Sequence, residues 1–162
     1  MKKSVRLYNV ILPIWLLVLF PQVWLIVLPG NLMVDCAVLL AALAVMKIAD
    51  KGAILKKLWW RFWLLGFAAD AIGVAWMVLG FVLILARPAW EDTLGHITHN
   101  AFAHPVAFLW TLAGVALAGV CIYFFDKRAM AACPQLDGRQ RYKIALTMAI
   151  VTAPWLFFIP MY

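Results

Sequence analysis

FWLLGFAADAIGVAWMVLGFVLIL (residues 62–85) is the stretch that decides the fold of this chain. An apolar run of this length is typical of a transmembrane helix, which needs about 20 residues to cross a bilayer. The composition agrees, because 67% of the 162 residues are hydrophobic and only 13% are charged, whereas soluble domains carry roughly a quarter charged residues. The apolar segments are continuous rather than alternating, so strands are excluded. We therefore expect an all-α, polytopic, integral membrane helical bundle.

Five apolar segments divide the chain, and its short length predicts a single membrane domain covering residues 1–162. The sequence PGN at 29–31 predicts a tight turn after the first segment, with Asn31 as the N-cap of the second. The connection 87–105 predicts a helix lying on the outer membrane surface. The predicted transmembrane spans are residues 8–28, 31–49, 62–86, 106–125 and 144–160.

The basic residues predict the orientation of these five spans. Every Lys and Arg except Arg87 falls in the amino-terminal tail, in residues 47–61 or in residues 126–143, and these segments share one side of a five-span arrangement. The positive-inside rule then predicts a multi-pass protein of the cell membrane, with a cytoplasmic N-terminus and an external C-terminus. The net charge of +7 therefore indicates basic residues that face the lipid bilayer and bind its anionic headgroups. It does not indicate binding to nucleic acid.

Asp70 is a carboxylate in the interior of the third predicted span. A charged side chain near the centre of a transmembrane helix costs about 2.5–3.5 kcal/mol on insertion scales, and the surrounding Leu, Ile, Val and Phe residues offset that cost. Two readings stay open. Asp70 binds a proton or a cation, or it makes a structural hydrogen bond to a neighbouring helix.

Small residues predict how the third and fourth spans pack. They recur at helical spacing around Asp70, on the same helix face, and small residues let another helix approach closely. The fourth span carries a matching stripe, so we expect these two faces to meet. The first stripe is Gly66, Ala69, Gly73 and Gly80, and the second is Ala107, Thr111, Gly114, Ala118 and Cys121.

Asp35 is the second candidate for proton or ion binding. It falls in the first turn of the second predicted span, four residues after Asn31. A carboxylate there interacts favourably with the helix dipole, so a structural explanation competes with ion binding.

The outer connection contains all three histidines of the chain. Read as one helix, it places Asp92, His96 and His99 at i, i+4 and i+7 on one face. Two imidazoles and a carboxylate can bind zinc or another divalent transition metal. His104 is either a further ligand of that metal or takes no part in the site. The alternative is a solvated helix face. No other cofactor is predicted.

Three function classes remain open. The first is a small transporter or channel subunit in which Asp70 binds a proton or a cation. The second is a non-catalytic accessory or assembly protein. The third is a membrane enzyme with a metal site in the outer connection, which is less favoured because the chain has no HExxH motif and its one serine, Ser4, lies in the amino-terminal tail. Five spans are few for a transporter acting alone, so we expect a homo-oligomer or a larger membrane complex.

Overall fold

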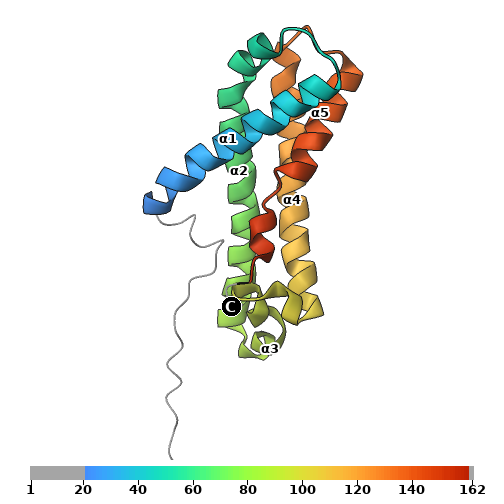
Figure 1. Cartoon of the computed structure of the whole chain (residues 1–162). Coiled ribbons are helices and arrows are strands. Elements are labelled where there is room, and N and C mark those ends of the chain that lie inside the picture. Colours follow the sequence, from blue (N-terminus) through green and yellow to red (C-terminus); the bar gives the residue numbers. More distant parts are fainter. Residues whose placement is uncertain (1–20, 161–162) are drawn as a thin grey trace, which may run out of the picture.

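The computed structural model describes residues 21–160, and every regular element in that range is helical. The all-α prediction is therefore confirmed for this part of the chain. Figure 1 shows two long helices, α2 and α4, running side by side, with α1 crossing them obliquely and α5 lying along α4. The α-helices are α1 (Pro21–Val45), α2 (Lys51–Ala86), α3 (Glu91–Leu94), α4 (Pro105–Ala129) and α5 (Gly138–Val151).

Within residues 21–160, three helices are long and apolar enough to cross a membrane: Leu25–Val45 within α1, Lys51–Ala86, and Pro105–Ala132, which includes α4. They indicate membrane association. Two of them contain the predicted spans 62–86 and 106–125. The five-span count and the placement of the two termini remain predictions.

Helix α1 corrects the predicted turn at residues 29–31. The helix continues through Pro29, so Asn31 is not an N-cap, and residues 21–30 and 31–45 form one helix rather than parts of two. Asp35 consequently lies inside α1 and not in a first turn. Prolines are tolerated within membrane helices. The Trp63 indole of α2 donates a hydrogen bond of 2.8 Å to the carbonyl of Leu28, the residue before Pro29, and so holds this part of α1 against α2. The remainder of the first predicted span, residues 8–20, lies outside the described residues.

Helix α2 is longer than a bilayer requires. Its 36 residues extend over roughly 54 Å at 1.5 Å per residue, against a hydrocarbon layer of about 30 Å. The basic side chains of α2 all lie in its first eleven residues, before the predicted span 62–86. The connections that follow α1 and α4 lie at this same end of the bundle (Figure 1), whereas Arg87 is at the other end.

Small residues bring α2 and α4 together, as the sequence predicts. A Cβ atom placed on Gly73 would lie 3.2 Å from the Ala118 Cβ and 3.4 Å from the carbonyl oxygen of Gly114. The backbones of the two helices therefore approach more closely than larger side chains would allow. Gly66 belongs to a different contact, because it faces Asp35 of α1.

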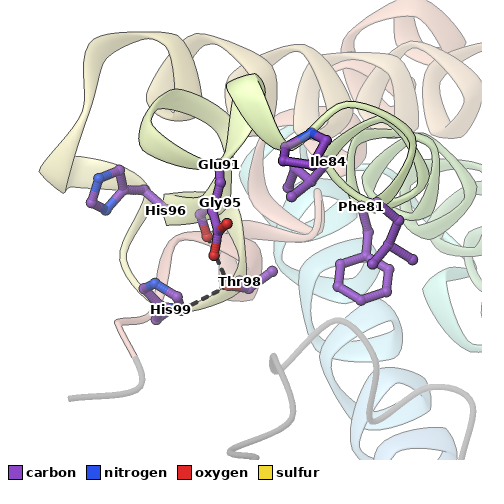
Figure 2. Close-up of a pocket in the computed structure, with 9 residues that line it drawn as sticks. Phe81, Ile84, Glu91, Gly95, His96, Thr98 and His99 are labelled. Carbon is purple, nitrogen blue, oxygen red and sulfur yellow. Dashed lines mark hydrogen bonds between the residues drawn. The ribbon is translucent and has the colours of Figure 1, made fainter. Parts of the chain in front are cut away.

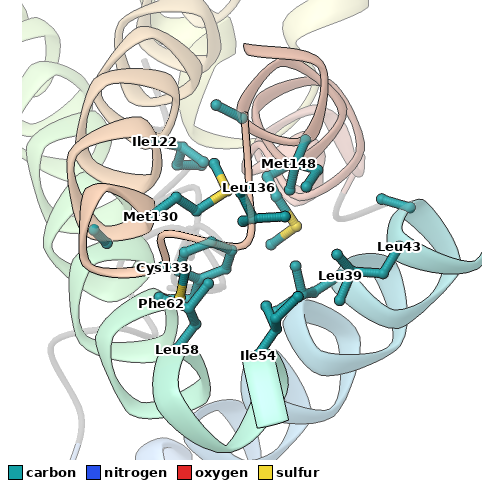
Figure 3. Close-up of a cluster of buried hydrophobic side chains, with 14 of the residues drawn as sticks. Leu39, Leu43, Ile54, Leu58, Phe62, Ile122, Met130, Cys133, Leu136 and Met148 are labelled. Atoms are coloured by element: carbon teal, nitrogen blue, oxygen red, sulfur yellow. The ribbon is translucent and has the colours of Figure 1, made fainter. Parts of the chain in front are cut away.

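The largest buried cluster joins α1, α2, α4 and α5 at the end that carries the basic connections (Figure 3). The segment between α4 and α5 closes over it. Lys57 and Arg141 donate hydrogen bonds to the carbonyl oxygens of Ala132 and Cys133, which fix this segment to α2 and α5. The cluster includes Leu39, Leu43, Ile54, Leu58, Phe62, Ile122, Met130, Cys133, Leu136, Ile144 and Met148.

The last predicted span, 144–160, is not one helix. Helix α5 has 14 residues and ends before Pro154, which has no backbone N–H with which to continue it. The Thr152 hydroxyl and the Trp155 indole donate to the carbonyl oxygens of Met148 and Ile150, at 2.9 and 2.8 Å. A short 3₁₀ helix, η6 (Trp155–Phe158), follows.

The outer connection is likewise not a continuous helix. It breaks into the 3₁₀ helices η2 (Pro88–Trp90), η3 (Gly95–Thr98) and η4 (Ala101–Ala103), with α3 between the first two. Side chains cap the last of these pieces and the start of α4. The Asn100 side chain accepts a hydrogen bond from the backbone N–H of Phe102. Such side-chain bonds to the backbone compete with helix continuation.

Candidate functional site

Asp70 faces α1 from the middle of α2. The Asn31 side-chain amide donates a hydrogen bond of 3.1 Å to Oδ2 of Asp70. The other carboxyl oxygen, Oδ1, is buried and has no hydrogen-bond partner. The predicted orientation of Asp70 into the bundle is therefore correct, and one of its two carboxyl oxygens makes no hydrogen bond.

Asp35 joins Asp70 at the same helix contact. It lies one helical turn after Asn31 and its side chain is only 8% exposed. Its Oδ2 atom would be 3.4 Å from a Cβ placed on Gly66, which precedes Asp70 by one turn. The missing side chain at position 66 thus makes room for this carboxylate. The two carboxylates are close enough to interact electrostatically, and we call them the α1–α2 carboxylate pair.

Asp126 is a third buried carboxylate, which the sequence analysis did not identify. It lies in α4 with an exposed fraction of 1%, its Oδ1 atom has no hydrogen-bond partner, and it interacts electrostatically with Asp35. Its place before Lys127 and Arg128 suggested a solvated loop. A signal for burial was present, because Ala118 and Ile122 precede it at intervals of four residues on the buried face of α4.

The three carboxylates come from three different helices, each of which contributes one. A buried carboxylate without a full set of hydrogen-bond donors is unfavourable in its charged form. Two carboxylates near each other cannot both be ionised without repulsion. A bound proton or cation removes both penalties, so this arrangement is chemically suited to taking up positive charge within the bundle.

The outer histidines cluster without forming the predicted metal site. The ring of His96 lies 6.1 Å from that of His99 and 5.9 Å from that of His104 between centroids, stacked in parallel on the latter. Within residues 21–160, no three His, Cys, Asp or Glu side chains are placed to hold a metal ion. The set Asp92, His96 and His99 is therefore not assembled there, and His99 leaves the helical backbone that carries the other two, with φ of −137°.

Two of these histidines have local structural roles. His104 is the N-cap of α4, and its Nδ1 atom accepts a hydrogen bond from the backbone N–H of Val106. The Thr98 hydroxyl donates its single proton to the carbonyl of Gly95 at 2.7 Å. The contact of 2.7 Å between Thr98 and Nδ1 of His99 must then be donated by the imidazole. Both side chains hold the outer connection in shape.

Replacing His104 by alanine should destabilise the protein. The variant loses the acceptor that caps α4, so its free energy of unfolding should fall by about 1 kcal/mol. His104→Asp should retain the stability, because aspartate is a good N-cap. Thermal unfolding in detergent compares the three proteins. Equal stability of the alanine and aspartate variants would contradict the capping role.

Acidification should destabilise the outer connection through His99. Burial, and then the neighbouring His96, lower the pKa of His99 from its ordinary value of 6.5. The unfolded chain therefore takes up a proton at higher pH than the folded chain. Stability contributed by the neutral imidazole is present above the unfolded value and is lost as the pH falls through the lowered pKa.

Unfolding midpoints measured between about pH 7 and pH 5 test this expectation. The decline should be shallower in His99→Gln, which cannot be protonated in this range. Parallel curves for the two proteins would refute it.

A comparison of the chain with protein-family models, with curated proteins and with solved structures found no match. The site must therefore be interpreted from its own chemistry.

Proposed function

We propose that this chain is a small multi-pass protein of the cell membrane that moves protons, as a transporter or channel subunit, with Asp70 as the group that binds the proton. One observation carries this proposal: a buried oxygen of Asp70 has no hydrogen-bond partner, although its other oxygen is bound to Asn31. A carboxyl group that is purely structural would be expected to use both oxygens.

The other two carboxylates support this proposal. Asp35 faces the same helix contact, and Asp126 lies nearer to the basic end of α4. A proton that resides on one member of the α1–α2 carboxylate pair relieves its repulsion with the other. Transfer of the proton between Asp70 and Asp35, and from Asp35 toward Asp126, would give it binding groups on three helices. A monovalent cation bound to the same oxygens is the alternative cargo.

The small size of the protein favours assembly. The candidate spans within residues 21–160 are fewer than those from which transporters with internal repeats are built, so we propose that the conducting pathway forms in a homo-oligomer or in a larger complex. The basic residues at the start of α2 and around α5 would hold that end of the bundle against anionic lipid headgroups.

Reconstitution tests the proposal. The purified full-length protein is placed in liposomes that contain a pH-sensitive dye, and a potassium-diffusion potential is applied. Faster proton entry than in protein-free liposomes is expected. Separate liposomes with a sodium or potassium gradient and an ion-sensitive dye test the alternative cargo. Absence of flux for all of these ions would reject transport by the chain alone.

An accessory or assembly role is the second candidate. The hydrogen bond between Asn31 and Asp70 favours it, because this bond alone would hold α1 against α2. In that case both residues would affect the stability of the helix contact, and no ion would move.

A further inference from the structure

A cavity of about 400 Å³ lies where α2 meets the outer connection (Figure 2). Its volume falls within the range of roughly 300–1,000 Å³ that is usual for small-molecule sites. One wall is apolar and belongs to the last turns of α2, and the other is polar and belongs to the segment that follows. The apolar wall includes Phe81, Ile84 and Leu85, and the polar wall includes Glu91, His96, Thr98 and His99.

The polar wall favours a cationic ligand. Glu91 supplies a carboxylate, and the described lining contains no Lys or Arg, although the chain as a whole has a net charge of +7. The Thr98 hydroxyl already donates its proton to the carbonyl of Gly95. Toward a ligand in the cavity, its oxygen can therefore act only as a hydrogen-bond acceptor. An anionic ligand would meet the Glu91 carboxylate without a lysine or arginine as partner in the described lining.

The apolar wall favours a ligand with a hydrocarbon body. Phe81, Ile84 and Leu85 lie at the end of a helix that is long and apolar enough to cross a membrane. A molecule entering from the lipid can place its chain along these residues while its head reaches the polar wall. This arrangement matches an amphiphile at the boundary between the bilayer and water.

We propose that this cavity binds an ammonium group attached to a hydrocarbon chain, with Glu91 as its ionic partner and the end of α2 as the contact for the chain. The ligand is either a free lipophilic amine or the ethanolamine headgroup of a phospholipid. The site is separate from the α1–α2 carboxylate pair, so it does not depend on proton transport.

Binding of a fluorescent long-chain alkylamine to the full-length protein in a nonionic detergent tests this proposal. The alcohol of equal chain length should bind roughly tenfold more weakly, since it lacks the ionic contact. Glu91→Gln should weaken amine binding by about the same factor and leave alcohol binding unchanged.

The matched control is Asp92→Asn, which removes the neighbouring carboxylate that does not line the cavity and should leave amine binding unchanged. Ile84→Trp, which fills the apolar wall, should weaken both amine and alcohol. Equal amine affinity in the wild type and Glu91→Gln, or equal affinity for amine and alcohol, would overturn the proposal.

Competition identifies the source of the ammonium group. Displacement of the amine by a short-chain phosphatidylethanolamine, but not by the corresponding phosphatidylglycerol, would assign the site to a lipid headgroup. Displacement by neither, with amine binding still dependent on Glu91, would assign it to free amines. Displacement by both equally would show that the chain alone is recognised and would reject the ionic contact.

Discussion

Asp70→Asn is expected to reduce proton movement to the level of protein-free liposomes. The substitution keeps the size of the side chain and an oxygen that can still accept the hydrogen bond from Asn31. It removes the group that gains and loses the proton. The helix contact should therefore persist, and the thermal stability of the variant in detergent should equal or exceed that of the wild type, because a buried ionisable group has been made neutral.

Two further variants separate function from structure. Asp35→Asn should lower the flux less than Asp70→Asn does, because Asp70, the group proposed to bind the proton, is still present. The flux should nevertheless fall, because the lost repulsion had favoured the protonated form of Asp70. Asp50→Asn is the control, because Asp50 is an exposed carboxylate between α1 and α2 and Asn tolerates its left-handed backbone, with φ of 55°. Wild-type flux in Asp70→Asn would assign this residue to helix packing alone.

Gly80→Ala is expected to produce the largest loss of stability from a single added methyl group. The new Cβ atom would lie 2.6 Å from Nε1 of Trp110 and 2.8 Å from Cδ1 of Ile97. The indole is rigid and stacks on Trp76 with 4.6 Å between ring centroids, so it cannot turn aside without breaking that stack. Such overpacking typically costs about 1–3 kcal/mol, which exceeds the roughly 1 kcal/mol that alanine gains in helix propensity over glycine.

Gly52→Ala provides the matched control. It adds the same methyl group to the same helix at a position with no atom within 4 Å, so its stability should stay constant or rise by up to about 1 kcal/mol. Thermal unfolding and tryptophan fluorescence compare the two variants. A Gly80→Ala protein as stable as Gly52→Ala, with an unchanged emission spectrum, would show that α2 and α4 can separate without penalty.

The sequence predicts the central helices well because their signals are local and redundant. In residues 62–86 an apolar run fixes the helix, and small residues at helical spacing fix the face that meets α4. Gly73 and Gly114 meet as expected. The inward orientation of Asp70 follows from the same spacing, because a carboxylate on the lipid face would have no means of satisfying its charge.

The errors arise where a local signal competes with tertiary contacts. Pro29 and Gly30 predict a turn in isolation, but α1 stays helical through them, with Trp63 bonded to a carbonyl beside the proline. In the other direction, the helical spacing of His96 and His99 predicts a shared face, but the helical backbone ends at Thr98 and His99 lies outside it, with φ of −137°. Neither outcome is encoded within a window of a few residues.

The burial of Asp126 was missed for another reason. Charge counting assigns a carboxylate beside two basic residues to water, whereas helix periodicity assigns it to the buried face of α4. The structure follows the periodicity. Where the two signals disagree at the end of a membrane helix, the buried charge itself becomes a candidate for function.

The excess length of α2 places part of its packing before the predicted span 62–86. Ile54 and Leu58 precede that span, and they are buried with Leu136 in a cluster at the basic end. With the predicted span in the bilayer, burial of these two side chains would remove apolar surface from water and gain the hydrophobic effect. The contact of Gly73 with Ala118 would gain no such driving force in lipid and would depend on close fit alone. The two ends of one helix would then be stabilised by different forces.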